Sequence, residues 1–214
     1  MQLITIVSGP LATNTYAVCG AKQGECFLVD PASAKKAFAF LEEQNLKLAH
    51  ILLTHGHFDH IIGVAELKEK TGAQVFISAT DAAALHDDTE NLSTMTRYPI
   101  QGCRADRELK DGDVFEAAGF TVKAISTPGH TRGGMCYLIE SERVLFSGDT
   151  LFKLSVGRSD LPGGDPQALY DSIAYKLFTL PGDYAVYPGH DSATTLDDER
   201  KFNPYMKQFN PEIW

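Results

Sequence analysis

The chain has 214 residues, of which 43% are hydrophobic and 22% are charged, as in an ordinary globular protein with a sizeable core. Its formal net charge of −9 argues against general binding to nucleic acids or anionic membranes, because both polyanions would repel it. No apolar run approaches the ~20 residues that a membrane helix needs. The first residues, MQLITIVSGPLATN, contain no basic leader, so we also expect no signal peptide.

Short β-rich runs alternate with helical patterns along the chain. We expect strands at 2–7, 15–19, 26–30, 50–54 and 73–78, and further strands within 114–127, 134–148 and 184–188. We expect helices at 31–45, 61–72, 80–87 and 163–182, and an irregular surface loop at 87–106. Asp165 and Pro166 are typical of a helix start. No linker or fixed-period repeat stands out, so the prediction is one α/β domain over residues 1–214.

The cysteines are scattered without a CxxC pair, at Cys19, Cys26, Cys103 and Cys136. Their even number leaves a disulfide framework as an alternative. A core-forming chain without a leader favours reduced thiols and a cytoplasmic location. We interpret these residues as small core hydrophobes.

Five of the seven histidines occur in three places, each after a β-rich run and in a turn that contains glycine. The three places are THGHFDH with His55, His57, Asp59 and His60, STPGHTRGG with His130, and VYPGH with His190. LFSGDT, with Asp149, has the same shape. A rigid scaffold often holds its functional residues at such strand ends. We therefore expect these four junctions to converge on one edge of the sheets.

The spacing within THGHFDH favours two metal ions over one. His55 and His57, two residues apart in an extended segment, project to the same side and can hold one ion. Asp59 and His60 follow where the chain turns into a helix, so they point towards a second ion. Seven candidate ligands exceed the four that one tetrahedral ion uses. They suit two ions about 3.5–4 Å apart that share one carboxylate.

Two other interpretations apply to histidines of this kind. A structural accident is the interpretation that we keep for His50 and His86, which have no such neighbours. A closed structural zinc site usually favours cysteine ligands, and none of the four cysteines falls in these motifs.

The motif HxHxDH with downstream TPGHT, SGDT and YPGH resembles the metallo-β-lactamase superfamily over most of the chain. This resemblance implies an αββα sandwich with the metals at one edge of the paired sheets. It implies one metal site at His55, His57 and His130, and another at Asp59, His60 and His190, with Asp149 as the bridge. The lactamases that name the superfamily commonly carry cysteine at the position of Asp149 and lack the Asp-His pair. That difference disfavours antibiotic hydrolysis.

Within the superfamily, SGDTLFKLSVGRSDLPGGD and DDERKFNPYM resemble the glyoxalase II group of hydroxyacylglutathione hydrolases, in its short bacterial form. The resemblance implies that a hydroxide held between two metals splits a glutathione thioester such as S-lactoylglutathione, as in methylglyoxal detoxification. Asp59 is the expected catalytic residue, because it could orient the nucleophile while ligating. Zinc is the expected metal, with iron or manganese as alternatives, because the ligand set contains no sulfur.

The expected partner is a small-molecule thioester, and the expected substrate contacts are cationic. These are Lys153, Arg158, Arg200 and Lys201, with solvated surface charge as the alternative for each. Two features depart from the group's pattern. Gly134 stands where a second histidine often occurs, and members with a full glutathione-binding region continue into further helices after FNPY, whereas this sequence ends at Trp214. We therefore expect a looser thiol preference.

Other activities of the same fold stay open. A persulfide dioxygenase with one iron can keep every motif residue while using only the counterparts of His55, His130 and Asp149 as ligands. Another ester or lactone hydrolase ranks behind it. The acidic charge and the missing extra domain disfavour a nucleic-acid-processing relative. The sequence does not indicate the oligomeric state.

Overall fold

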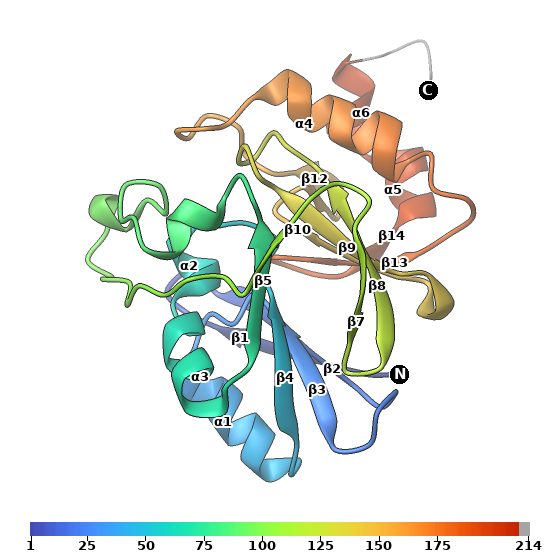
Figure 1. Cartoon of the computed structure of the whole chain (residues 1–214). Helices are drawn as coiled ribbons and strands as arrows, with labels where there is room; N and C mark the ends of the chain where they lie inside the picture. The colour runs from blue at the N-terminus through green and yellow to red at the C-terminus, as the bar shows by residue number, and fades with distance from the viewer. Residues whose placement is uncertain (210–214) are drawn as a thin grey trace.

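The computed structural model describes residues 1–209, and most of its strands form two six-stranded sheets (Figure 1). The first sheet, in spatial order, contains β1 (Gln2–Ser8), β2 (Thr13–Cys19), β3 (Glu25–Val29), β4 (Lys47–Leu52), β5 (Gln74–Ser78) and β6 (Arg107–Leu109). The second contains β14 (Thr194–Thr195), β13 (Ala185–Pro188), β10 (Val144–Gly148), β9 (Met135–Ile139), β8 (Phe120–Ser126) and β7 (Val114–Ala117). A separate hairpin consists of β11 (Leu151–Phe152) and β12 (Ser155–Val156).

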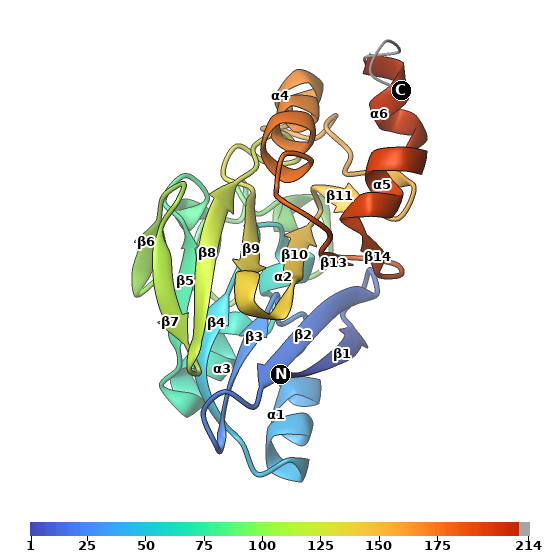
Figure 2. The same ribbon diagram turned by 90° about the vertical axis from the view of Figure 1, so that its right-hand side faces the viewer.

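Helices cover the outer face of each sheet. The first sheet packs against α1 (Ala34–Glu43) and α3 (Val64–Thr71). The second packs against α4 (Pro166–Ser172), its π-helical continuation η4 (Ile173–Leu177), α5 (Leu196–Phe202) and α6 (Pro204–Phe209). Figure 2 shows these two helical layers at opposite ends of the molecule.

Side chains alternate between the two faces of each sheet, and this alternation produces three apolar layers. Phe27 of β3 and Phe146 of β10 lie between the two sheets, in the central layer. Their sequence neighbours face the helices, because successive side chains of a strand point to opposite faces. Leu28 lies in the layer with α1 and α3, and Leu145 lies in the layer with α4 and η4. The layers are helix, sheet, sheet and helix, so the predicted αββα sandwich is confirmed.

The predicted helix at 61–72 is two helices in the structure, α2 (Phe58–Ile61) and α3. They are separate because the amide of Gly63 donates to the carbonyl of Pro31, 3.0 Å away, instead of continuing the helix from α2. A Cβ at Gly63 would lie 2.5 Å from that carbonyl oxygen, so only glycine permits this approach. Gly72, with a φ of +72°, ends α3 as predicted.

Other boundaries also differ from the prediction. The strand predicted at 50–54 is β4, which begins at Lys47, and the helix predicted at 163–182 begins at Pro166, with Asp165 as its N-cap. Short 3₁₀ segments occur at η1 (Ala82–Leu85), η2 (Ser93–Met95) and η3 (Glu140–Glu142). The predicted elements did not include β6, β11, β12, β14, α5 and α6, most of which are only two or three residues long or lie near the end of the chain.

The chemistry of the cysteines agrees with their interpretation as core residues. All four are free, and Cys19, Cys26 and Cys136 are buried. Burial raises the pKa of the Cys26 thiol to about 12 and that of Cys136 to about 11. Across residues 1–209, no helix is both long and apolar enough to cross a bilayer.

Candidate metal centre

The candidate ligands lie on loops that follow the carboxyl ends of strands in both sheets. The loop after β4 contains His55, His57, Asp59 and His60, while β8, β10 and β13 lead to His130, Asp149 and His190, respectively. Strands β10 and β13 are parallel, and β8 and β10 are both antiparallel to β9, so these three strands end at the same edge. The structure brings all seven side chains together there.

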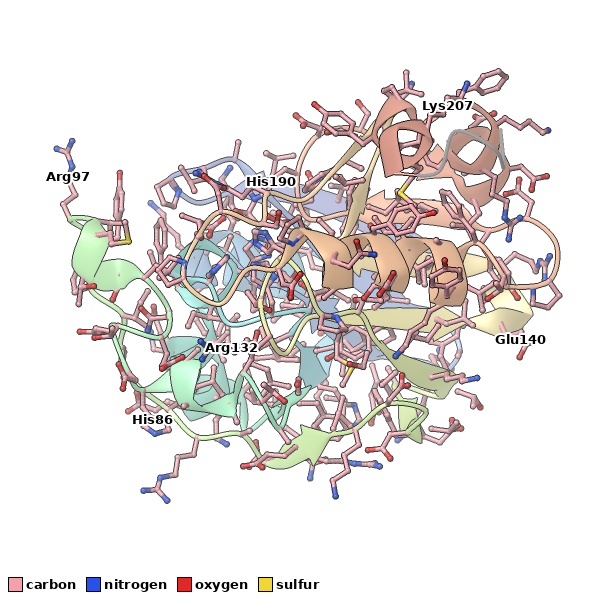
Figure 3. The ribbon with its side chains drawn as sticks, turned by 90° about the horizontal axis from the view of Figure 1, so that it is seen from above. His86, Arg97, Arg132, Glu140, His190 and Lys207 are labelled. Atoms are coloured by element: carbon pink, nitrogen blue, oxygen red, sulfur yellow. The ribbon has the colours of Figure 1, made fainter. Side chains whose placement is uncertain are left out.

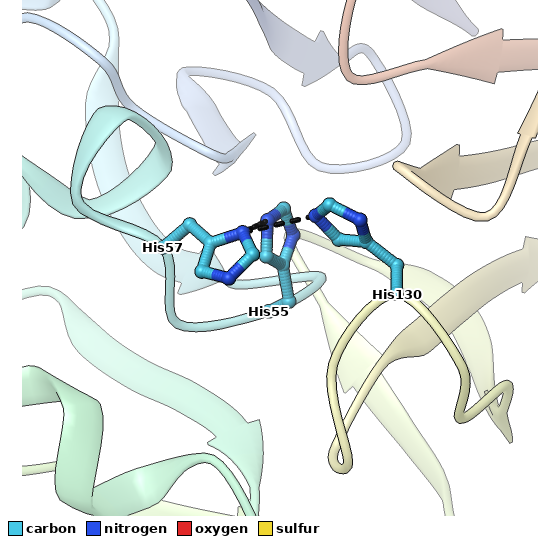
Figure 4. Close-up of side chains that lie close together, drawn as sticks. All are labelled: His55, His57 and His130. Carbon is cyan, nitrogen blue, oxygen red and sulfur yellow. Dashed lines mark hydrogen bonds between the residues drawn. The ribbon is translucent and has the colours of Figure 1, made fainter. Parts of the chain in front are cut away.

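The first cluster consists of His55, His57 and His130 (Figure 4). The Nδ1 atom of His57 lies 3.1 Å from Nε2 of His55 and 2.9 Å from Nε2 of His130. Burial and the neighbouring imidazoles hold the pKa of His55 well below its usual value and lower that of His57 to about 3. Both rings are therefore neutral, as a metal ligand must be.

The second cluster consists of Asp59, His60 and His190. The Nε2 atoms of His60 and His190 lie 3.3 Å apart, and they lie 3.4 and 3.3 Å from Oδ2 of Asp59. Burial lowers the pKa of His60, but the carboxylates of Asp59, Asp149 and Asp30 outweigh it and raise that pKa to about 10. A divalent cation would compensate the same carboxylates.

Asp149 lies between the two clusters. Its Oδ1 is 3.5 Å from Nε2 of His60, and its Oδ2 is 3.6 Å from Nε2 of His130 and 3.5 Å from Nε2 of His190. Within residues 1–209, this buried Oδ1 accepts no hydrogen bond, which is costly unless a cation is its partner. The imidazole and carboxylate donors suit zinc, iron or manganese. The residues therefore fit divalent metal ions on both sides of Asp149.

Asp30, at the end of β3, fixes the orientation of two ligand rings. Its Oδ2 accepts hydrogen bonds from the Thr54 hydroxyl at 2.6 Å and from Nδ1 of His60 at 3.0 Å, and its Oδ1 accepts one from the Thr54 amide at 2.8 Å. The Thr54 oxygen then accepts from Nδ1 of His55 at 3.1 Å. Both rings are thereby held with Nδ1 protonated and Nε2 free for a metal.

Other supporting contacts come from distant parts of the chain. The Nδ1 of His130 donates to the Arg158 carbonyl at 2.7 Å, which leaves Nε2 for the cluster. The Thr13 hydroxyl donates to Oδ2 of Asp59 at 2.8 Å. Buried Asp81 accepts from the Gly56 amide at 3.2 Å and the Thr131 hydroxyl at 2.8 Å, so it joins the loops of both sheets. Burial raises the pKa of Asp81.

Sequence reasoning missed these supporting residues. Asp30 follows the apolar run FLV at a strand end, as Asp149 follows a β-rich run, but its turn lacks the glycine that marked the other candidates, so only the strand-end part of that signal points to it. Thr13 and Asp81 carry no local signal, because their partners lie 46 and 50 residues away in the sequence.

Both clusters face a cleft of about 380 Å³. The ligands His57, Asp59, His130, Asp149 and His190 line one side of it. Apolar side chains form much of the remainder, namely Leu11, Phe58, Leu92, Phe152, Val156 and Leu161. A substrate with an apolar part beside its reacting bond would suit this arrangement.

The predicted cationic contacts have unequal positions. Arg158 lines the cleft, but its guanidinium makes two hydrogen bonds of 2.8 Å to the carboxylate of Asp160. Arg200 instead ties α5 to the segment after η4, by donating to the carbonyls of Phe178, Leu180 and Gly182 and to Asp197. The structure therefore does not place Arg200 in the cleft. Lys153 and Lys201 are exposed and are not among the residues that line it.

Comparison with known proteins supplies further findings. The model of a family described as the metallo-beta-lactamase superfamily matches residues 8–190. Hydroxyacylglutathione hydrolase GloC of Haemophilus influenzae is 32% identical over 182 residues, which cover 84% of this chain and 86% of that protein. The crystal structure of BLEG-1 B3 metallo-β-lactamase has a TM-score of 0.91 and 34% identity, with 96% and 99% of the two chains covered. TTHA1623 in a di-iron-bound form has a TM-score of 0.81 and 34% identity, with 94% and 99% covered.

Proposed function

The chain belongs to the metallo-β-lactamase superfamily and is a metallo-hydrolase of that family, and from this premise we propose that it cleaves glutathione thioesters of the S-lactoylglutathione type. One observation carries the proposal. Two three-ligand clusters of nitrogen and oxygen donors share Asp149 and open on one cleft. The similarity to GloC supports the thioester as the substrate, at 32% identity.

When bound, two divalent ions would supply a water that ionises near neutral pH and a Lewis acid for the thioester carbonyl. In the proposed arrangement His55, His57 and His130 hold one ion, Asp59, His60 and His190 hold the other, and Asp149 contacts both. The absence of sulfur donors in this set leaves the metal as zinc, iron or manganese, and we propose zinc.

The chain's own residues direct the attack. Asp59, fixed by the Thr13 hydroxyl, faces the cleft and orients the attacking water in our proposal. The water oxygen forms the new bond to the acyl carbon, the carbon–sulfur bond breaks, and a hydroxy acid and a free thiol leave. Because the thiol pKa is ~8.5, the sulfur needs little protonation to depart.

A β-lactam is a second candidate substrate, because the similar BLEG-1 structure is described as a B3 metallo-β-lactamase. The carboxylate at position 149 argues against it, because the lactamases that name the superfamily commonly carry cysteine at that position. The persulfide dioxygenase is the other alternative, and it would use only three of these ligands for one iron.

One experiment separates the three activities. The metal content of the purified protein is measured, and turnover is then followed with S-lactoylglutathione under air and under nitrogen, with a chromogenic cephalosporin, and with glutathione persulfide in an oxygen electrode. We expect about two ions per chain and thioester hydrolysis that is independent of oxygen. Oxygen uptake with persulfide and no thioester cleavage would establish the dioxygenase instead, and cephalosporin hydrolysis alone would establish the lactamase. Chelator-treated protein is the control.

A further inference from the structure

A second pocket of about 350 Å³ adjoins the metal cleft. The two share the lining residues His57 and Leu92, so the side pocket lies directly next to the metal cleft. We call it the side pocket and define it by His57, Thr80, Glu90, Leu92, Arg132 and Gly163. None of these except His57 was a candidate residue in the sequence.

The side pocket carries two exposed charged side chains that have no protein partner in the part of the chain that the structure describes. Within residues 1–209, neither the guanidinium of Arg132 nor the carboxylate of Glu90 forms an ion pair or a side-chain hydrogen bond. Arg158, in contrast, is already bound to Asp160 in the neighbouring cleft. In a chain with a net charge of −9, the unpaired Arg132 should therefore attract an anionic group more strongly than Arg158, which Asp160 already neutralises.

The walls of the side pocket are held by buried contacts. Asp81 fixes the backbone of Gly56 and the hydroxyl of Thr131, the residue before Arg132. On the opposite side, buried Asn91, next to Glu90, donates to the Ala84 carbonyl at 2.9 Å and accepts the Phe58 amide at 2.9 Å. The two charged residues are therefore exposed side chains on anchored backbone, as a preorganised binding site requires.

We infer that the side pocket binds the α-amino-acid end of the substrate's thiol part, with Arg132 on its carboxylate and Glu90 on its ammonium group. This inference rests on the proposed thioester hydrolase activity. A pocket with one free cation and one free anion complements a zwitterion better than a simple anion. Arginine offers a planar fork that matches a carboxylate, and glutathione carries such an amino-acid end.

The test compares variants of the metal-loaded protein. For Arg132→Met we expect KM for S-lactoylglutathione to rise about tenfold or more, because a charge-assisted contact is lost, with kcat little changed. KM should not rise for S-lactoyl-N-acetylcysteamine, which has no amino-acid end. Glu90→Gln should raise KM for S-lactoylglutathione but not for its N-acetylated form. Arg97→Ala is the matched control, because Arg97 projects from the periphery of the molecule, while Arg132 and His190 lie further in (Figure 3).

A binding measurement distinguishes the failure of this inference from the failure of the proposed function. S-methylglutathione cannot be hydrolysed, so calorimetry reports its affinity without turnover. Weaker binding by Arg132→Met than by Arg97→Ala supports the inference even if the wild type hydrolyses no thioester. Equal affinities, or equal losses on both thioesters, would overturn it while leaving the hydrolase proposal intact. A wild type that neither binds S-methylglutathione nor hydrolyses the thioester would overturn both.

Discussion

The two ligand clusters are built from the same kind of strand-end loop, but they differ in charge and exposure. The first consists of three imidazoles that are almost completely buried. The second contains a carboxylate, and its His190 side chain keeps 21% of its surface exposed to the cleft. The first cluster therefore offers uncharged lone pairs, and the second offers negative charge with one ligand partly exposed, although both face the substrate cleft.

This difference shows that burial and neighbouring charge give histidines in one centre opposite chemistry. Burial among other rings lowers the pKa of His57 to about 3, whereas three carboxylates raise that of His60 to about 10. A metal therefore displaces no proton from His55 or His57 at neutral pH, but it must displace one from His60. The four predictions below test whether the clusters behave differently in solution.

The largest effect is expected from Asp149→Asn, because this substitution should damage both clusters and so abolish the difference between them. A neutral amide leaves two cations less compensated, and Asp149 is the residue within reach of both clusters. We expect kcat/KM to fall by more than about a hundredfold, the upper end for loss of a supporting partner. Elemental analysis should show reduced occupancy of both sites. Full occupancy with unchanged activity would rule out a shared ligand.

Single-ligand variants should separate the clusters. His57→Ala and His190→Ala should each retain about one ion per chain, because each removes a ligand from only one cluster. We expect the smaller activity loss for His190→Ala, since water from the cleft can occupy the position of this partly exposed ring. Metal content and steady-state rates, measured on the same preparations, check this. Loss of both ions in either variant would show that the clusters bind metal as a single unit.

Asp30→Asn should act directly on the second cluster through His60 and indirectly on the first through Thr54 and His55. An amide nitrogen facing Nδ1 of His60 would replace an acceptor with a donor, so the ring would lose its fixed orientation. We expect metal affinity to fall about 10- to 100-fold, as for other partners of metal-bound histidines. Chelator competition measures the affinity. The same substitution at Asp106, which pairs with Lys68 at the surface, is the control and should change nothing.

The smallest effect is a difference in pH dependence. Below pH 10 His60 carries a proton that a metal must displace. The apparent metal affinity of the second cluster should therefore fall about tenfold for each unit by which the pH is lowered. The slope of the first cluster should be shallower, because His55 and His57 have lowered pKa values and contribute no such proton at neutral pH. Zinc titrations of His57→Ala and His190→Ala isolate the two slopes. Equal slopes would contradict the assigned proton positions.

Local patterns in the sequence predicted an α/β domain and named every member of the two clusters, and the family resemblance of the motifs implied the αββα layers. Strand-end glycine turns mark His130, Asp149 and His190 within a few residues of each loop. The contacts of Arg200 were not predictable in this way. Proximity to His190 in the sequence suggested the cleft, but α5 turns the side chain towards the carbonyls after η4. Arg132 was missed because its pocket is assembled from four separate loops.

The irregular segment 87–106 contributes Thr89, Glu90 and Leu92 to the pockets but none of the candidate ligands. Near its centre the segment is attached to the rest of the protein by Asn91, whose side chain donates to the Ala84 carbonyl and whose own carbonyl accepts from the Phe58 amide. Tyr98 of the same segment also stacks on Phe58 of the ligand loop, with the ring centroids 6.2 Å apart. Because the segment lines both pockets but supplies no candidate ligand, directed evolution of a new specificity should begin at its pocket-lining residues and keep Asn91 and Tyr98.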